Sequence, residues 1–178
     1  MDEIRATRLT TSTEFTGRIF SVKRDLVRMP NGREVTMEIV THPGSVVLLP
    51  LQADGRIVLI RQYRYALDRW IWEVPAGSLD PGEDPVAAAA RECEEEIGLV
   101  PGRVEFAGAW YPTPGFVTEV MNFYRLSELR PPSPDGPQAE QDEDEDLRVQ
   151  VFTLEAARGM VRSGEIIDLK TAWGLTLV

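Results

Sequence analysis

Four glutamates stand within five residues near the end of a predicted helix, at Glu92, Glu94, Glu95 and Glu96. Helical residues three and four apart share a face, so Glu92 lies beside Glu95 and Glu96 while Glu94 points elsewhere. Like charges at this spacing repel, and carboxylates are unfavourable near a helix C-terminus. Arg91 can pair with Glu95 but cannot neutralise the whole face.

Two interpretations of this acidic face compete. The first is a solvated helix surface, which is what a run of charges usually forms. The second is a carboxylate cluster for Mg²⁺ or Mn²⁺, since these cations prefer oxygen ligands. A bound cation would offset the repulsion, and Mg²⁺ commonly bridges protein carboxylates to substrate phosphates. The second interpretation therefore predicts phosphoryl chemistry, in which a metal polarises an oxygen and activates a water.

The residues around the helix decide between these interpretations. Seven positions at fixed spacing are occupied by Gly77, Glu83, Arg91, Glu92, Glu95, Glu96 and Gly98. If each residue type has a frequency of about one in ten, a chance match has a probability of ~10⁻⁷ per window. The segment resembles the Nudix box of the Nudix hydrolase family, with Cys93 where the family usually has a larger aliphatic residue. Free cysteine behaves as a small hydrophobe, and no histidine lies near it in the sequence to make it a nucleophile.

The resemblance implies a metal site made of carboxylates and one backbone carbonyl. Its members are Glu92, Glu95, Glu96 and the carbonyl of Ala76. Glu95 counts among the catalytic residues as well, and Arg91 would orient the glutamates while pairing with Glu83. The implied cofactor is Mg²⁺, with Mn²⁺ as a substitute. The implied Nudix fold is a mixed β-sheet sandwiched between helices, with the acidic helix over the metal site.

Four features outside the box resemble the ADP-ribose and nucleoside diphosphate sugar pyrophosphatase branch of this family. Residues 61–64 followed by 72–77 are similar to that branch's approach to the box, and residues 113–116 carry its Pro-Gly pair. Residues 143–149 match the acidic segment that brings a carboxylate over the metals. Residues 17–20 resemble an N-terminal element that reaches across a dimer to the substrate.

These features imply a set of substrate contacts: Arg64, Arg61, Glu73, Arg18, Phe20, Pro114 and Phe116. Arg64 is expected to hold a phosphate with its planar guanidinium, and Arg61 by a weaker form of the same argument. Glu73 either accepts a hydrogen bond from an adenine amino group or pairs with an arginine. Glu143 is expected to help activate the attacking water and Glu145 to complete a metal site. This register can differ by two residues because carboxylates recur at every step; the alternative is a solvated loop.

The elements that position these groups follow from the pattern of apolar residues. Residues 15–29 and 33–41 predict two extended strands around the turn at Pro30-Asn31-Gly32, which form an N-terminal β-hairpin extension. Residues 46–51 form a continuous apolar run, typical of a strand buried on both faces. Asp84-Pro85 begins the acidic helix and Gly98 ends it.

Strands and helices alternate without a strict βαβ order, so the predicted class is α/β (α+β) with a mixed sheet. We expect residues 1–42 to be an N-terminal β extension that forms a homodimer, an expectation that rests on the resemblance. We expect residues 43–178 to be the catalytic domain.

Composition excludes several classes of protein. The 178 residues are near the usual size of one domain, and a net charge of −10 argues against nucleic acid as a partner. One cysteine and one histidine exclude a disulfide framework and make a zinc site unfavourable. No apolar run approaches the ~20 residues that span a membrane, and the first residues do not resemble a signal peptide. These observations predict a cytoplasmic protein with no membrane partner.

The resulting hypothesis is an Mg²⁺-dependent pyrophosphohydrolase that cleaves the diphosphate of ADP-ribose to AMP and ribose 5-phosphate, or acts on a related nucleoside diphosphate sugar. One alternative is a Nudix hydrolase of another nucleotide, such as GDP-mannose, a dinucleoside polyphosphate or an oxidised nucleotide. The other is a Nudix domain that senses a nucleotide without cleaving it.

Overall fold

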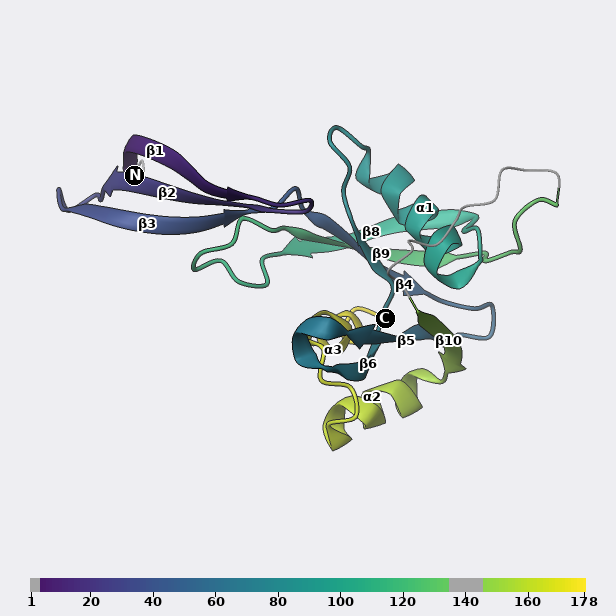
Figure 1. Ribbon diagram of the computed structural model, residues 1–178. Coiled ribbons are helices and arrows are strands. Elements are labelled where there is room, and N and C mark those ends of the chain that lie inside the picture. The colour runs from purple at the N-terminus through teal and green to yellow at the C-terminus, as the bar shows by residue number, and fades with distance from the viewer. Residues whose placement is uncertain (1–3, 135–145) are drawn as a thin grey trace. The chain divides into compact units, whose positions relative to one another are not determined.

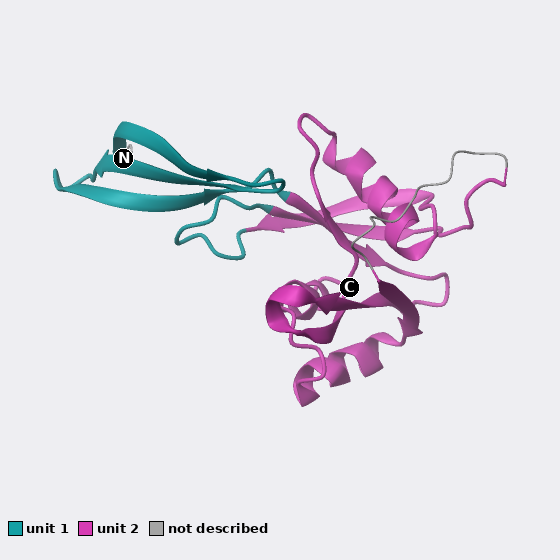
Figure 2. Cartoon of the chain, viewed as in Figure 1, with its two compact units in different colours: residues 1–44, 111–120 teal, residues 45–110, 121–178 magenta. Residues whose placement is uncertain are grey.

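The computed structural model describes residues 4–134 and 146–178. The chain forms two compact units, and both are discontinuous in sequence (Figure 2). Unit 1 contains Met1–Gly44 and Tyr111–Val120, and unit 2 contains Ser45–Trp110 and Met121–Val178. In the described part of the chain, no helix is long and apolar enough to cross a membrane.

Unit 1 is built on a three-stranded antiparallel sheet in the order β1-β2-β3 (Figure 1). The strands are β1 (Thr7–Thr16), β2 (Ser21–Arg28) and β3 (Glu34–Thr41). The predicted hairpin is present as β2 and β3, but its first strand is shorter than the predicted 15–29, since residues 15–16 belong to a preceding strand, β1, and 17–20 connect the two. The amide of Gly17 donates to the carbonyl of Phe20 at 2.9 Å and so separates β1 from β2. The polar composition of β1 gave no apolar alternation from which to predict it.

Unit 1 also contains a distant segment of the chain. The amide of Val40 donates to the carbonyl of Phe116 at 2.8 Å, and the amide of Thr118 donates to the carbonyl of Val40 at 3.0 Å. These bonds attach residues 111–120 to β3. No residue of β1, β2 or β3 is buried in the single chain.

Unit 2 contains two sheets. Its strands are β4 (Ser45–Pro50), β5 (Ile57–Arg64), β6 (Arg69–Glu73), β7 (Ala76–Ser78), β8 (Arg103–Trp110), β9 (Met121–Ser127) and β10 (Leu147–Phe152). One sheet has the order β7-β4-β9-β8 and the other the order β10-β5-β6. Strands β4 and β9 are parallel, whereas β7 and β8 pair with their neighbours antiparallel, so the predicted mixed sheet is confirmed.

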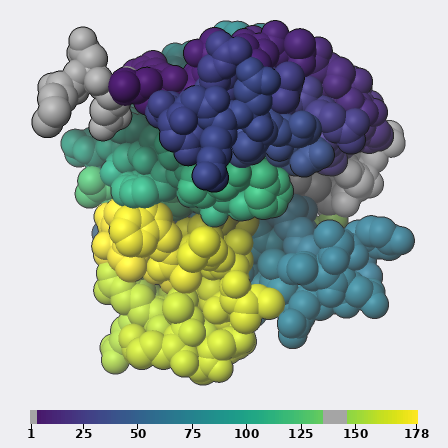
Figure 3. All heavy atoms as spheres, turned by 90° about the vertical axis from the view of Figure 1, so that its left-hand side faces the viewer, coloured from purple at the N-terminus to yellow at the C-terminus, as the bar shows by residue number. Residues whose placement is uncertain are grey.

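Helices pack against both faces of the strands of unit 2. The helical elements are η1 (Tyr65–Leu67, a 3₁₀ turn), α1 (Pro85–Ile97), α2 (Leu154–Ser163) and α3 (Leu169–Gly174). On β4, Val46 and Leu48 join the core under α1, while Val47 and Leu49 join a second core with Ala157 of α2. Figure 3 shows α2 in yellow-green beside the yellow segment that carries α3. The continuous apolar run of β4 is explained by its burial on both faces.

Helix α1 begins and ends where its sequence predicts. The carboxylate of Asp84 accepts from the amide of Val86 at 3.1 Å, and Pro85 occupies the first turn. Gly98 adopts φ 68° at the C-terminus, a left-handed conformation that suits glycine. These two signals therefore fix where α1 begins and where it ends.

Burial of β4 predicts a large effect of truncation there. Leu48 is 0% exposed, so we expect Leu48→Ala to lower the free energy of unfolding by about 2–5 kcal/mol. Leu169 is 66% exposed, and Leu169→Ala is expected to change it by about 0.5 kcal/mol or less. Urea denaturation followed by circular dichroism measures both. Equal losses in the two variants would contradict the assignment of β4 to the core.

Candidate active site

The acidic helix α1 lies directly against the short strand β7. A Cβ atom at Gly77 would overlap the carboxylate of Glu92, so this position accepts no side chain without displacing the glutamate. One residue earlier, the amide of Ala76 donates to Oε2 of Glu96 at 2.9 Å. Glycine at 77 leaves the space in which the carboxylate of Glu92 approaches the backbone.

Arg91 connects three carboxylates. Its Nε and Nη2 donate to the two oxygens of Glu83 at 2.9 and 3.1 Å. Its Nη1 donates to Oε1 of Glu92 at 2.8 Å and to Oε2 of Glu95 at 2.6 Å. The predicted pairing of Arg91 with Glu83 and Glu95 is confirmed. The hydrogen bond to Glu83 raises the pKa of Arg91, and the same bond lowers the pKa of Glu83.

The donor set in this region suits a hard divalent cation. The acidic set consists of four glutamates, Glu83, Glu92, Glu95 and Glu96, and each offers carboxylate oxygens. Arg91 supplies one positive charge against their four negative charges. Glu92 and Glu96 are buried, where negative charge requires compensation. A carboxylate has about four lone-pair sites, so an arginine contact does not exhaust its capacity to bind.

The carboxylates are not arranged as a finished metal site. Among the described residues, no group of three Asp, Glu, His or Cys side chains is placed to hold a metal ion. A nitrogen of Arg91 bridges Glu92 and Glu95, and Glu96 is bound to the backbone of Ala76. The metal ligands Ala76, Glu92, Glu95 and Glu96 therefore stay a prediction that the donor chemistry supports.

A second charged group surrounds Glu73 at the end of β6. Arg64 donates Nε to Oε1 at 2.7 Å and Nη2 to Oε2 at 2.8 Å. Lys170 forms an ion pair with the same carboxylate. Burial raises the pKa of Glu73, but the bonds from Arg64 and Lys170 outweigh burial and hold this pKa below its usual value. The pKa of Arg64 is raised by its bond to Glu73.

Two roles were expected for Glu73, and the structure contains one of them, the ion pair with an arginine. A contact with an adenine amino group stays a prediction. Lys170 and the nearby Asp168 were not among the residues predicted from the sequence. Nothing in the local sequence indicates that Lys170 meets Glu73, which lies 97 positions before it.

Arg61 and Arg64 lie on opposite faces of β5, because side chains alternate along a strand and these residues are three apart. Arg61 pairs in register with Trp72, and its guanidinium carbon stands 5.8 Å from the centre of that ring. Besides the bond to Glu73, the negative charge of Glu96 on α1 contributes to the raised pKa of Arg64. The structure thus brings Arg64, and not Arg61, to the side of the acidic helix.

The remaining predicted residues belong to unit 1 or lie outside the described residues. Arg18, Phe20, Pro114 and Phe116 all belong to unit 1, and both phenylalanines are exposed there. Glu143 and Glu145 lie outside the described residues. The substrate contacts and the carboxylates of the acidic segment stay predictions.

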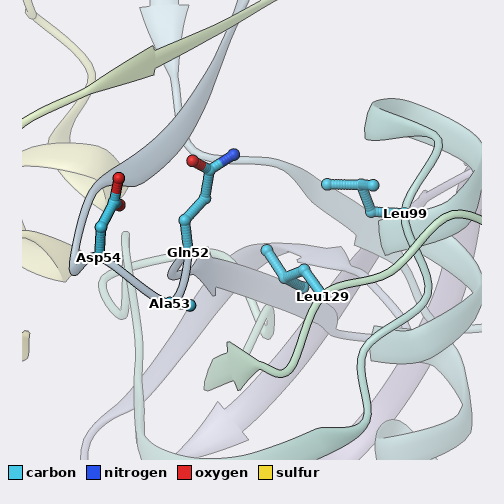
Figure 4. Close-up of a pocket in the computed structure, with 5 residues that line it drawn as sticks. All are labelled: Gln52, Ala53, Asp54, Leu99 and Leu129. Carbon is cyan, nitrogen blue, oxygen red and sulfur yellow. The ribbon is translucent and has the colours of Figure 1, made fainter.

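A cavity of about 310 Å³ opens elsewhere in unit 2 (Figure 4). It is lined by Gln52, Ala53, Asp54, Leu99 and Leu129. None of these residues belongs to the acidic set or to the group around Glu73. The cavity therefore contains no side chain of the predicted metal site.

Comparisons with known proteins agree on one family. The family model described as NUDIX domain matches residues 41–169. The chain is 38% identical over 161 residues to ADP-ribose pyrophosphatase of Bacillus subtilis, which covers 90% of this chain and 85% of that protein. It is 38% identical over 162 residues to ADP-ribose pyrophosphatase of Mycobacterium tuberculosis, covering 90% of this chain and 76% of that protein.

A solved structure supports the fold. The crystal structure of an ADP compounds hydrolase superposes with a TM-score of 0.81 and covers 99% of this chain and 94% of that one. The sequence identity is 23%, so this likeness bears on the architecture alone.

The structure predicts that Cys93 is inert. Cys93 is buried on α1, and burial raises the pKa of its thiol to about 12, with Glu94 and Glu96 adding to the shift. Because the thiolate is the reactive form, we expect no labelling by a disulfide reagent at pH 8 in the folded protein. Full labelling is expected in denaturant. Rapid stoichiometric labelling of the native protein would contradict the burial.

Proposed function

The chain belongs to the Nudix hydrolase family and is ADP-ribose pyrophosphatase-like, and from that premise we propose that it cleaves the diphosphate of ADP-ribose, with Mg²⁺, to AMP and ribose 5-phosphate. The observation that carries the proposal is the contact of α1 with β7, where Glu92 covers Gly77 and Glu96 binds the amide of Ala76. This contact gathers carboxylates and a backbone segment at one place.

In this proposal, Mg²⁺ is held by Glu92, Glu95, Glu96 and the carbonyl of Ala76, and Mn²⁺ can replace it. When bound, the cation polarises phosphoryl oxygens and lowers the pKa of water. Arg91 keeps the glutamates in place through its bonds to Glu83, Glu92 and Glu95. Its contribution is to position the ligands.

Arg64 is the proposed contact with the diphosphate. Its side chain is 40% exposed, whereas Glu73 is 1% exposed and is also paired with Lys170. Arg64 can therefore turn toward a phosphate oxygen while Lys170 continues to compensate the buried charge of Glu73. The guanidinium fork matches phosphate oxygens in two-point contacts.

The remaining predicted groups complete the proposal. Glu143 would orient or deprotonate the attacking water, and Glu145 would complete a metal site. Arg18, Phe20, Pro114 and Phe116 would contact the substrate from unit 1. The cytoplasmic location and the absence of nucleic acid partners stay predictions from the sequence.

Two alternatives remain as competing hypotheses. A Nudix hydrolase of GDP-mannose, a dinucleoside polyphosphate or an oxidised nucleotide would share the same carboxylates. A nucleotide sensor could lose a ligand glutamate without loss of function, whereas this chain keeps all seven positions of the box. The complete box favours an enzyme over a sensor.

Turnover of a panel of nucleoside diphosphate derivatives with Mg²⁺ tests the proposal. We expect ADP-ribose to be the preferred substrate, with AMP and ribose 5-phosphate identified by chromatography. Preference for another nucleotide would refute the substrate, and no turnover of any member would favour the sensor.

A matched pair of variants tests the carboxylates in the same assay. Glu96→Gln removes a proposed ligand charge and is expected to lower kcat by about 100-fold or more. Glu94→Gln, on a different face of α1, is expected to retain activity within about twofold. Unchanged turnover by the Glu96 variant would remove Glu96 from the site.

We further propose that the chain is a homodimer formed through unit 1. A three-stranded sheet with no buried strand residue in the single chain leaves Phe15, Ile19 and Phe20 exposed. Light scattering is expected to give twice the chain mass of 20.0 kDa. A monomeric protein with full activity would remove the roles of Arg18 and Phe20 at a shared site.

A further inference from the structure

Two consecutive residues of α3 contact two consecutive residues at the end of β6. Lys170 forms an ion pair with Glu73, and the hydroxyl of Thr171 accepts from the amide of Val74 at 2.8 Å. Two side chains of α3 therefore hold the last residue of β6 by its side chain and the residue that follows it by its backbone amide. The contact comes immediately before the segment that leads to Ala76 and Gly77.

The hydroxyl of Thr171 has a fixed orientation. It donates to Oδ2 of Asp168 at 2.6 Å, so its hydrogen is directed away from Val74 and its lone pair toward the amide. The same oxygen of Asp168 accepts from the amide of Thr171 at 2.9 Å and lies 3.1 Å from the nitrogen of Lys170. Thr171 is 0% exposed, so bulk water cannot replace the hydroxyl.

The peptides that follow Val74 are also held individually. The carbonyl of Pro75 accepts from the amide of Leu48 at 2.8 Å, and the amide of Ala76 donates to Glu96 at 2.9 Å. Ala76 pairs with Val47 in the β4–β7 ladder. Val74, Pro75 and Ala76 thus each have a backbone partner of their own, and Thr171 supplies the one at Val74, two residues before the carbonyl of the proposed metal site.

We propose that Thr171 is a positioning residue, which fixes the peptide at Val74 and thereby the placement of the Ala76 carbonyl and of Glu96 for a divalent cation. The metal part of this inference rests on the proposed function. The position of Ala76 itself does not, because it is a property of the metal-free chain. Thr171 acts only through Val74 and touches neither substrate nor metal.

Two variants separate the hydroxyl from the packing. Thr171→Val keeps the size of the side chain but leaves the buried amide of Val74 without an acceptor, and Thr171→Ser restores the acceptor. Mn²⁺ binding is measured directly by electron paramagnetic resonance of the free ion. We expect the valine variant to bind Mn²⁺ roughly 10-fold to 100-fold more weakly, the range typical for loss of a group that orients a metal ligand. The serine variant is expected to bind within about twofold of the parent.

Amide hydrogen exchange provides a readout without metal. In Thr171→Val we expect faster exchange at both Val74 and Ala76, with no change at Ala88, whose amide donates to Asp84 within α1. In Thr171→Ser all three are expected to exchange as in the parent. Faster exchange at Val74 and Ala76 alone supports positioning, because general destabilisation would accelerate Ala88 as well.

Three results for Thr171→Val would overturn the inference. The first is an unchanged Mn²⁺ affinity together with a lowered melting temperature. The second is faster amide exchange at Val74 but not at Ala76, and the third is equally faster exchange at Val74, Ala76 and Ala88. If the parent protein binds no Mn²⁺, the proposed metal-dependent function fails. The exchange measurement then still decides whether Thr171 positions Ala76.

Discussion

The proposed site depends on the close approach of α1, which carries the glutamates, to the backbone of β7. Glu92 occupies the space that a side chain at residue 77 would need, and Glu96 binds the amide of the residue before it. Burying these charges is unfavourable unless they are compensated. Arg91 supplies part of the compensation through its bonds to Glu83, Glu92 and Glu95. The contact that carries this electrostatic penalty is also the place where we propose that a divalent cation binds.

The remainder of unit 2 holds the two sides of this contact at a fixed distance. Strand β4 is buried on both faces, pairs with β7 on one edge and with β9 on the other, and packs its even-numbered residues under α1. A shift of β4 would move β7 relative to the glutamates. The two cores, one on each face, restrain such a shift because close-packed side chains leave little room for rearrangement.

Local signals in the sequence predict much of this arrangement. Asp84, Pro85 and Gly98 mark the ends of α1, and the spacing of Gly77 and the glutamates identifies the family. Long-range partners carry no such signal. The sequence around Glu73 does not indicate that Lys170 pairs with it. Arg61 and Arg64 could be assigned to opposite faces only after both were found on one strand, β5. Residues 1–42 were expected to be a β extension, but the bounds of β1 were not predicted because exposed polar strands lack the apolar period on which such predictions depend.

The bond between Val74 and Thr171 joins residues 97 positions apart. Contacts of this separation form late relative to local ones, because closing a long loop costs entropy before the contact can repay it. The caps of α1 are local, since Asp84 and Gly98 adjoin the helix that they cap. The acceptor for the amide of Val74 comes instead from α3, at the other end of unit 2 in sequence. The acidic helix is thus bounded by nearby residues, whereas the backbone opposite it depends on a distant part of the chain.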